Sequence, residues 1–260
     1  MTARTPVAVL GDVVLYESDA ATLGPRSWVG DLVIAYFFEL FTARLASGEG
    51  ASLAAATSEA AAATDSPRVI LLEPTVSYMA AMIGSEALRE VLDVPRTAGS
   101  RTLSDLVAEA TMVLLPLCDK SDPDAGVGGS HWSLLAFRRA EGGGAFEHYD
   151  SAGGANAEHA RTVAATLAPL VNRGGATLGE VALHEMADGP QQTNLFDCGI
   201  YTIATAEVLC GLFAAGTLPL PGRAAPALKL LTPLAIHEKR RALLEAVEEA
   251  SRAARAGAAE

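Results

Sequence analysis

The hydrophobic residues of this chain recur at helical spacing in some segments and in short continuous runs in others. Segment 28–46, WVGDLVIAYFFELFTARLA, has helical periodicity, with Ser27 as a cap and Asp31 in the first turn, where a carboxylate is favourable. Segments 68–74 and 111–118, RVILLEP and TMVLLPLC, are apolar runs of strand length. The pattern therefore predicts one early helix and two buried strands.

Two further strands are predicted over 131–139 and 145–151, HWSLLAFRR and AFEHYDS. The Gly-rich turn AEGGG joins them into a hairpin. An amphipathic helix opened by Asn156 follows, and then a strand within 178–186, LGEVALHEM.

A long apolar helix is predicted just after Cys198, and a charged amphipathic helix over 233–255. Because strands and helices are partly segregated along the chain, an α+β fold fits better than a doubly wound parallel sheet. The length of 260 residues suits a single domain. We place its core at about 12–245, treat the Ala-rich segment 46–66 as an insertion and expect 250–260 to fray.

Charge and composition exclude several classes of protein. The formal net charge of −12 argues against a nucleic-acid partner, which requires clustered Lys and Arg. The apolar segment 198–216 contains Glu207 and predicts a buried helix rather than a membrane span. The three cysteines have neither disulfide nor zinc spacing, and the first residues lack a signal-peptide cleavage site. We therefore expect a cytoplasmic and/or nuclear protein without a membrane partner.

Cys198 is the candidate nucleophile. The turn DCG followed by an apolar helical run puts its sulfur at the positive end of a helix, which favours a thiolate. A cysteine taken alone is more often a small buried hydrophobic residue. Cys118, in an apolar strand, and Cys210, in the middle of the apolar helix, fit that description.

His131 is the candidate base and Asp150 its orienting carboxylate. The hairpin brings the start of its first strand beside the end of its second, and one of the two adjacent registers places these side chains diagonally on one face. A carboxylate behind an imidazole fixes its tautomer and stabilises the imidazolium. His148 is the alternative base, although a strand neighbour of Asp150 is worse placed to reach a third element. The remaining histidines are expected to be bystanders: His159, His184 and His237.

Gln192 is the candidate oxyanion donor. It stands six positions before Cys198 in the loop sequence QQTNLFDC. Acyl transfer to a thiolate passes through an oxyanion, which a side-chain amide and the backbone N–H of the nucleophile can stabilise together. Glutamines in loops are ordinarily solvent-facing, and only the neighbouring Cys, His and Asp favour the catalytic interpretation.

These motifs resemble a known family. GGSHWSLLAF, HYDS, QQTNLFDCGIYTI and LLTP occur in this order after SWVGDLVIAYFFELF. They are similar to the ubiquitin-like-protein-specific cysteine proteases, the Ulp/sentrin-protease (SENP) family related to adenovirus protease. The similarity runs from about residue 12 to residue 245 and is closest to the deneddylase branch, which acts on the Nedd-type (Rub) modifier.

The resemblance implies a papain-like α+β protease that cleaves after a C-terminal Gly-Gly, for deconjugation and precursor maturation. It implies the same roles for His131, Asp150, Cys198 and Gln192, with no metal or organic cofactor. The expected partner is a ubiquitin-like modifier, Nedd-type favoured, bound by a monomer.

The resemblance also implies three substrate-binding residues. Trp28 and Trp132 match tryptophans that cover the narrow tunnel for Gly-Gly, and Asp31 matches an aspartate directed toward the basic tail of the modifier. Gly30 stands where the family commonly has Asn, which weakens an assignment of modifier selectivity. Other readings are a SUMO- or ubiquitin-directed protease of the same fold, a modifier-binding pseudoenzyme and an acyltransferase on this scaffold.

Overall fold

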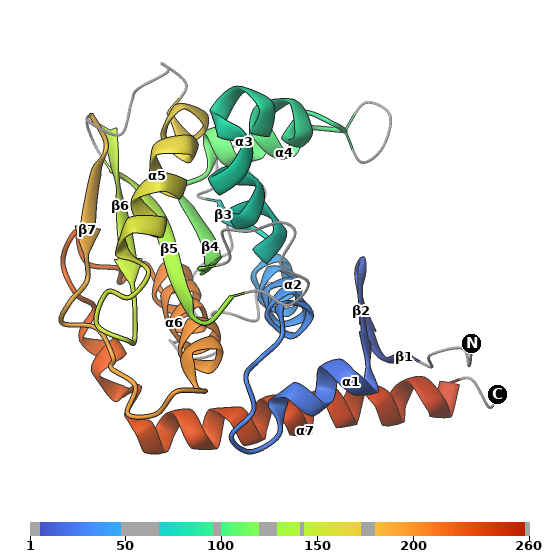
Figure 1. Ribbon diagram of the computed structural model, residues 1–260. Helices are drawn as coiled ribbons and strands as arrows, with labels where there is room; N and C mark the ends of the chain where they lie inside the picture. The colour runs from blue at the N-terminus through green and yellow to red at the C-terminus, as the bar shows by residue number, and fades with distance from the viewer. Residues whose placement is uncertain are drawn as a thin grey trace.

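The computed structural model describes residues 6–47, 68–95, 100–119, 129–140, 143–172 and 180–257 (Figure 1). Within these ranges the centre is a five-stranded sheet in the order β3-β4-β5-β6-β7. Its strands are β3 (Val69–Leu71), β4 (Met112–Cys118), β5 (Trp132–Ala140), β6 (Gly143–Tyr149) and β7 (Ala182–Glu185). The middle strand β5 pairs antiparallel with both β4 and β6, whereas β3 pairs in parallel with β4, and β7 with β6. This mixed sheet, packed with helices, confirms the predicted α+β class.

The three middle strands of the sheet are largely buried on both faces, whereas the edge strands β3 and β7 are partly exposed. Along β4, Met112 and Leu114 join one hydrophobic cluster, while Val113 and Leu115 join the other. This alternation follows from the two-residue period of a strand. It explains why β4 reads in the sequence as a continuous apolar run, as is typical of strands covered on both sides.

Helices form the two outer layers. One face of the sheet packs against α2 (Asp31–Ser47) and α6 (Cys198–Ala214). The other packs against α3 (Pro74–Leu92), α4 (Leu103–Glu109) and α5 (Ala157–Val171). In Figure 1 these two groups of helices lie on opposite sides of β4 and β5. The sheet is therefore the middle layer of three.

Helix α6 lies at the centre of its layer. Ile200, Ile203 and Leu209 on it are fully buried, and α6 contacts β5, α2 and α7. A helix that is apolar on all sides is stable only when other elements surround it. Its burial fixes the position of its first residue, Cys198.

Helix α7 (Pro233–Gly257) runs along the outside of the domain (Figure 1). Its apolar side, with Ile236, Leu243 and Val247, faces the cluster around α6 and α2. Along α7 lie β1 (Pro6–Leu10), α1 (Glu17–Ala20) and the 3-10 helix η1 (Ala21–Leu23), whereas β2 (Val13–Tyr16), which pairs with β1, rises away from α7 and contacts α2. A second 3-10 helix, η3 (Pro226–Leu230), precedes α7.

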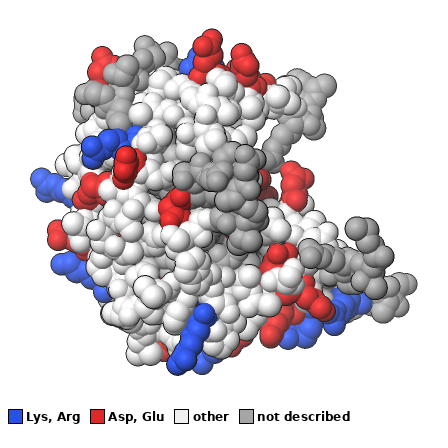
Figure 2. Space-filling view, in the orientation of Figure 1, with Lys and Arg blue, Asp and Glu red and all other residues white. Residues whose placement is uncertain are grey.

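The charged side chains are distributed over the surface. On the face shown in Figure 2, basic side chains lie singly or in small groups near the edge, and acidic ones lie among them. None of the helices in the described part of the chain combines the length and apolar character that a membrane crossing requires.

Two boundaries differ from the sequence predictions. Ser27 does not cap α2, because residues 27–30 lie outside any helix and α2 begins at Asp31, with the amide of Ile34 donating to the carbonyl of Gly30. The tail that was expected to fray from residue 250 is helical to Gly257 as the last turns of α7. The Ala-rich insertion lies almost entirely outside the described residues.

Candidate active site

Cys198 is the first residue of α6, as predicted from the DCG turn. Its residue surface is only 1% exposed, and the preceding Asp197 occupies the cap position of the helix. The first amides of a helix have no partner within the helix, and the helix dipole is positive at this end. The sulfur therefore sits where a negative charge is stabilised.

His131 lies next to Cys198, and its ring bonds Asp150. The distance between His131 Nε2 and Asp150 Oδ1 is 2.6 Å. The hairpin register pairs Leu134 with Tyr149, so its continuation places Ser133 opposite Asp150 and His131 on the diagonal. Of the two registers that the sequence allows, the structure adopts the one that brings these side chains together. With Nε2 occupied, Nδ1 is the ring nitrogen left for Cys198.

The surroundings of His131 favour its charged form. Burial lowers the pKa of His131, but the hydrogen bonds with Asp150 and Cys198 and the charges of both groups outweigh it and raise the pKa to about 9. Burial raises the pKa of Asp150, but the hydrogen bond from His131 and those from the amides of Asn156 and Ala152 lower it below its usual value. A charged imidazole beside the cysteine is the partner that a thiolate nucleophile requires.

Asn156 holds this pair in place. Its backbone amide donates to Asp150 Oδ2 at 2.8 Å, while the amide of Ala152 donates to Asp150 Oδ1 at 2.8 Å. The side-chain nitrogen of Asn156 donates to the carbonyl of His131 at 3.3 Å and to Ser133 Oγ at 3.0 Å. Asn156 was expected only to open α5, and its side chain makes no capping bond. It instead joins both partners of the His–Asp pair.

His148, the alternative base, is occupied elsewhere. Its Nδ1 lies 2.7 Å from Glu185 Oε2 and its Nε2 lies 3.0 Å from Ser133 Oγ. Both ring nitrogens are therefore engaged away from Cys198. His148 supports Ser133, which in turn accepts a hydrogen bond from Asn156 behind the site.

The glutamines lie on the loop before α6. Gln192 accepts a hydrogen bond from Ser151 Oγ at 2.8 Å, and its Nε2 donates to the carbonyl of Asn194 at 2.6 Å. Gln191 donates to the carbonyl of Asp150 at 3.1 Å. The loop is thus tied to the residues around Asp150, and the side-chain nitrogen of Gln192 has a second hydrogen for another acceptor.

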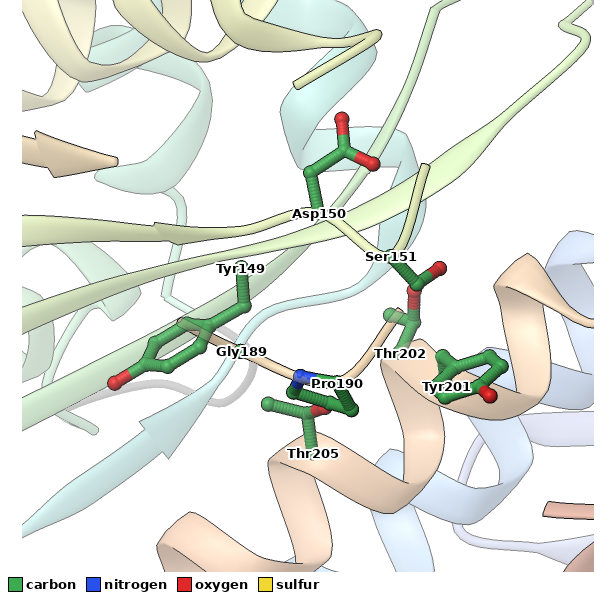
Figure 3. A pocket seen from close by; sticks show the side chains of 8 residues that line it. All are labelled: Tyr149, Asp150, Ser151, Gly189, Pro190, Tyr201, Thr202 and Thr205. Carbon is green, nitrogen blue, oxygen red and sulfur yellow. The ribbon is translucent and has the colours of Figure 1, made fainter. Parts of the chain in front are cut away.

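A cavity of about 10 Å³ separates this loop from α6. Figure 3 shows Gly189 and Pro190 beside Thr205, with the carboxylate of Asp150 turned away from them. A space of this size is near the lower limit for one water molecule. It is packing space beneath the site rather than a place for a substrate.

The two tryptophans occupy neighbouring segments. The indole nitrogen of Trp132 donates to the carbonyl of Val29 at 3.0 Å, which places Trp132 beside the residue that follows Trp28. Trp28 is 47% exposed, and Asp31 is exposed at the start of α2. All three residues predicted to bind substrate therefore lie on or next to segments that border Cys198.

The other cysteines and histidines lie on other elements of the fold. Cys210 is buried within α6, and burial, together with the charge of Glu207, raises the pKa of its thiol to about 12. Cys118 ends β4. His159 is on α5, His237 is on α7, and His184 is on the edge strand β7. These positions fit the prediction that Cys118 and Cys210 are not the nucleophile.

Residues 89–211 match the profile of the Ulp1 protease family, C-terminal catalytic domain. Over 234 residues the chain is 32% identical to sentrin-specific protease 8 of Homo sapiens, an alignment that covers 88% of this chain and 90% of that protein. The chain belongs to the Ulp1 protease family. NEDD8-specific protease 1 of Arabidopsis thaliana is 36% identical over 105 residues, covering 40% of this chain and 43% of that protein. The resemblance to the SENP family and its deneddylase branch is therefore confirmed.

Solved structures agree with this assignment at the level of the fold. The C-terminal Ulp1 protease domain, solved in complex with Smt3, the yeast orthologue of SUMO, matches with a TM-score of 0.59 at 15% identity. That match covers 96% of this chain and 90% of the other. A de-sumoylating protease matches with a TM-score of 0.56 at 11% identity, covering 95% and 91%. This protein is thus a cysteine protease with the Ulp1 fold.

Sequence reasoning missed several residues that position the site of this Ulp1-family protease. Asp119 accepts a hydrogen bond from the amide of His131 at 3.0 Å. Burial raises the pKa of Asp119. Hydrogen bonds from Ser130 and His131 outweigh burial and hold this pKa below its usual value. The contacts of Asn156 with His131, Ser133 and Asp150 were also missed. A residue that acts through backbone groups of distant segments leaves no local sequence pattern, and only the fold reveals it.

Proposed function

We propose that this Ulp1-family protease is a thiol isopeptidase and endopeptidase that cleaves after the C-terminal Gly-Gly of a Nedd-type (Rub) ubiquitin-like modifier, in deconjugation and precursor maturation. The observation that carries the chemistry is the 2.6 Å contact between His131 Nε2 and Asp150 Oδ1 beside Cys198. The similarity to sentrin-specific protease 8 and NEDD8-specific protease 1 supports a modifier of the Nedd type. We further propose that it acts in the cytoplasm and/or nucleus.

The proposed reaction uses His131 twice. In the active ion pair its Nδ1 already holds the proton that came from Cys198 Sγ, and the thiolate attacks the carbonyl carbon of the terminal glycine. His131 then gives this proton to the leaving lysine amine, which breaks the isopeptide bond and leaves a thioester on Cys198. A water molecule, deprotonated by His131, hydrolyses the thioester and regenerates the thiol. Asp150 stays ionised and stabilises the imidazolium.

Gln192 is the proposed side-chain donor to the oxyanion. Its Nε2 hydrogen that is not used by Asn194 would join the backbone N–H of Cys198 at the tetrahedral intermediate. The contacts with Ser151 and Asn194 would hold the amide before the charge develops, which is what makes an oxyanion donor effective.

Trp28 and Trp132 are proposed to cover the slot for Gly-Gly, and Asp31 to bind the basic tail of the modifier. The bond from Trp132 to Val29 supports a narrow slot, because it joins the segments that carry the two tryptophans. Two flat rings over a slot admit glycine and exclude any larger side chain. The exposed carboxylate of Asp31 lies at a suitable surface for a cationic tail, where electrostatic attraction speeds association.

The proposal is tested with modifiers that carry a C-terminal electrophile. The purified protein is mixed separately with Nedd-type, SUMO-type and ubiquitin probes, and adducts are detected by mass, with Cys198→Ala as the control. We expect an adduct with the Nedd-type probe that is absent in the variant. An adduct with another modifier only would keep the mechanism and overturn the selectivity. No adduct with any probe would favour a modifier-binding pseudoenzyme or an acyltransferase.

A further inference from the structure

Arg240 is a buried arginine on α7 that bonds two separate segments beside the active site. Its side chain is 6% exposed. Nε and Nη2 donate to Asp197 Oδ1 at 2.9 and 2.8 Å, and Nη2 also donates to the carbonyl of Phe196 at 3.0 Å. Nη1 donates to the carbonyls of Gly24 at 3.1 Å and Thr22 at 3.3 Å. These five contacts use all five N–H donors that a guanidinium has.

The first of the two segments is the nucleophile loop, which we define as residues 194–197. It ends directly before Cys198. Within it, Asn194 Oδ1 accepts hydrogen bonds from the amides of Phe196 and Asp197, and Asn194 Nδ2 donates to Asp197 Oδ2 at 2.7 Å. The loop is thus closed on itself, and Arg240 fastens it to α7.

The second segment, residues 22–24, leads to Trp28. The hydroxyl of Thr22 accepts a hydrogen bond from the amide of Gly30 at 3.2 Å, so Thr22 also fixes the residue after Val29. Val29 in turn accepts the hydrogen bond from Trp132. By holding Thr22, the guanidinium therefore also fixes the segment that contains Trp28 and that Trp132 contacts.

No other side-chain type can make this set of contacts. The guanidinium is planar with its donors in a fixed fork, whereas a lysine presents three donors from one point. The ring of Phe196 lies 5.9 Å from the guanidinium carbon and adds a cation–π contact. The guanidinium thus joins Arg240 to Thr22, which lies 218 positions away in the chain.

We propose that Arg240 is a positioning residue for catalysis, which holds the nucleophile loop and the Trp28 segment in one fixed relation. It does not touch the reacting atoms. It sets the distance between Cys198 and the slot that delivers the scissile carbonyl. The proposal deepens the proposed function and rests on it for the choice of substrate.

The test compares two double variants that each remove a buried ion pair. Arg240→Met with Asp197→Asn removes the ion pair between these two residues without leaving an unpaired carboxylate. Arg138→Met with Glu147→Gln removes the matched control pair, whose arginine is also buried and whose Nη1 lies 3.0 Å from Glu147 Oε1. Arg138 lies toward the far end of β5 from His131. Arg240→Lys is the conservative variant.

Hydrolysis of a Nedd-type modifier with a C-terminal fluorophore is measured well below every melting temperature. We expect the Arg240 double variant to lose about 10²-fold in kcat/KM, because a displacement near 1 Å has an effect of this order. The loss should appear in both KM and kcat, with partial rescue in Arg240→Lys. The control pair should lower the melting temperature alone. An Arg240 double variant within twofold of the wild type, or a control that loses as much, would overturn the proposal.

A second measurement does not need the modifier. Alkylation of Cys198 by iodoacetamide is followed by peptide mass at about pH 6 and pH 9. The quantity compared between variants is the rate at pH 6 divided by the rate at pH 9. Access to the sulfur affects both rates, whereas the pairing of Cys198 with His131 promotes the reaction at the lower pH. We expect this ratio to fall in the Arg240 double variant only. If no modifier probe reacts with the wild type, the proposed function fails, and this ratio still decides the role of Arg240.

Discussion

A methyl group built on Gly199 would lie 2.8 Å from Cβ of Val29 and 3.4 Å from Cδ1 of Trp132. Gly199 directly follows Cys198 in α6, and Trp132 directly follows His131. The close approach of α6 to these residues therefore sets both the spacing of the catalytic pair and the width of the proposed slot.

The variant Gly199→Ala tests this relationship. The added methyl group must displace Val29 or Trp132, and we expect kcat/KM for a Gly-Gly substrate to fall by about 10²-fold. Gly211→Ala on the same helix is the matched control, because a methyl group there meets no atom within 4 Å. The control should retain full activity and gain slightly in stability. Equal activity of the two variants would show that the approach of Val29 to α6 is not needed for catalysis.

The variant Gln192→Ala tests the oxyanion donor. We expect kcat to fall by roughly 10²–10³-fold with little change in KM, because the donor acts on charge that exists only in the transition state. Ser151→Ala is the control: it removes the hydroxyl that donates to Gln192 and keeps the amide. Steady-state kinetics of the two variants separate these effects. A loss in Ser151→Ala as large as that in Gln192→Ala would reduce Gln192 to support of the loop.

The hairpin and α6 were predictable from the sequence because their signals are local. HWSLLAFRR and AFEHYDS are apolar runs joined by a Gly-rich turn, and the register of this hairpin determines which side chains meet. Cys198 at a helix start likewise follows from the turn before it and the apolar run after it. For this reason the sequence predicts the His131–Asp150 pair.

Other parts depend on packing that a sequence does not express. The helix α2 starts at Asp31 and not after Ser27, because the non-helical segment before it packs Val29 against α6. The helices α3 and α4 and the β1–β2 hairpin were not predicted. Arg240 lay among the charged residues of an amphipathic helix, where a solvent-facing position is the usual expectation.

The variant Trp28→Ala tests the slot. Because 47% of Trp28 is exposed, its removal should change the melting temperature little, whereas KM for a Gly-Gly substrate should rise. Substrates with alanine in place of the last-but-one glycine should be cleaved relatively better than by the wild type, since the exclusion of side chains is relaxed. Kinetics on the two substrates and a thermal melt give the answer. A large drop in melting temperature with unchanged substrate preference would make Trp28 a packing residue.

The variant Asp150→Asn tests the charge behind His131. Asp150 accepts hydrogen bonds from His131 and from the amides of Ala152 and Asn156. An asparagine has one oxygen, so its NH2 group must face one of these donors. By analogy with serine proteases we expect turnover to fall by about 10⁴-fold.

The pH dependence provides the second reading of the same variant. In the wild type the active ion pair is lost as His131 deprotonates, so activity should decline as pH rises through about 9. The pKa of Asp150 is lowered, so this carboxylate stays ionised over this pH range. Its titration therefore adds no change of activity at pH values above its usual pKa. Without the charge of Asp150, only Cys198 counters the lowering of the His131 pKa by burial, so this pKa should fall. The alkaline limb of kcat/KM in Asp150→Asn should therefore shift to lower pH. A limb that stays at about 9 would mean that Asp150 is not the group that keeps His131 charged.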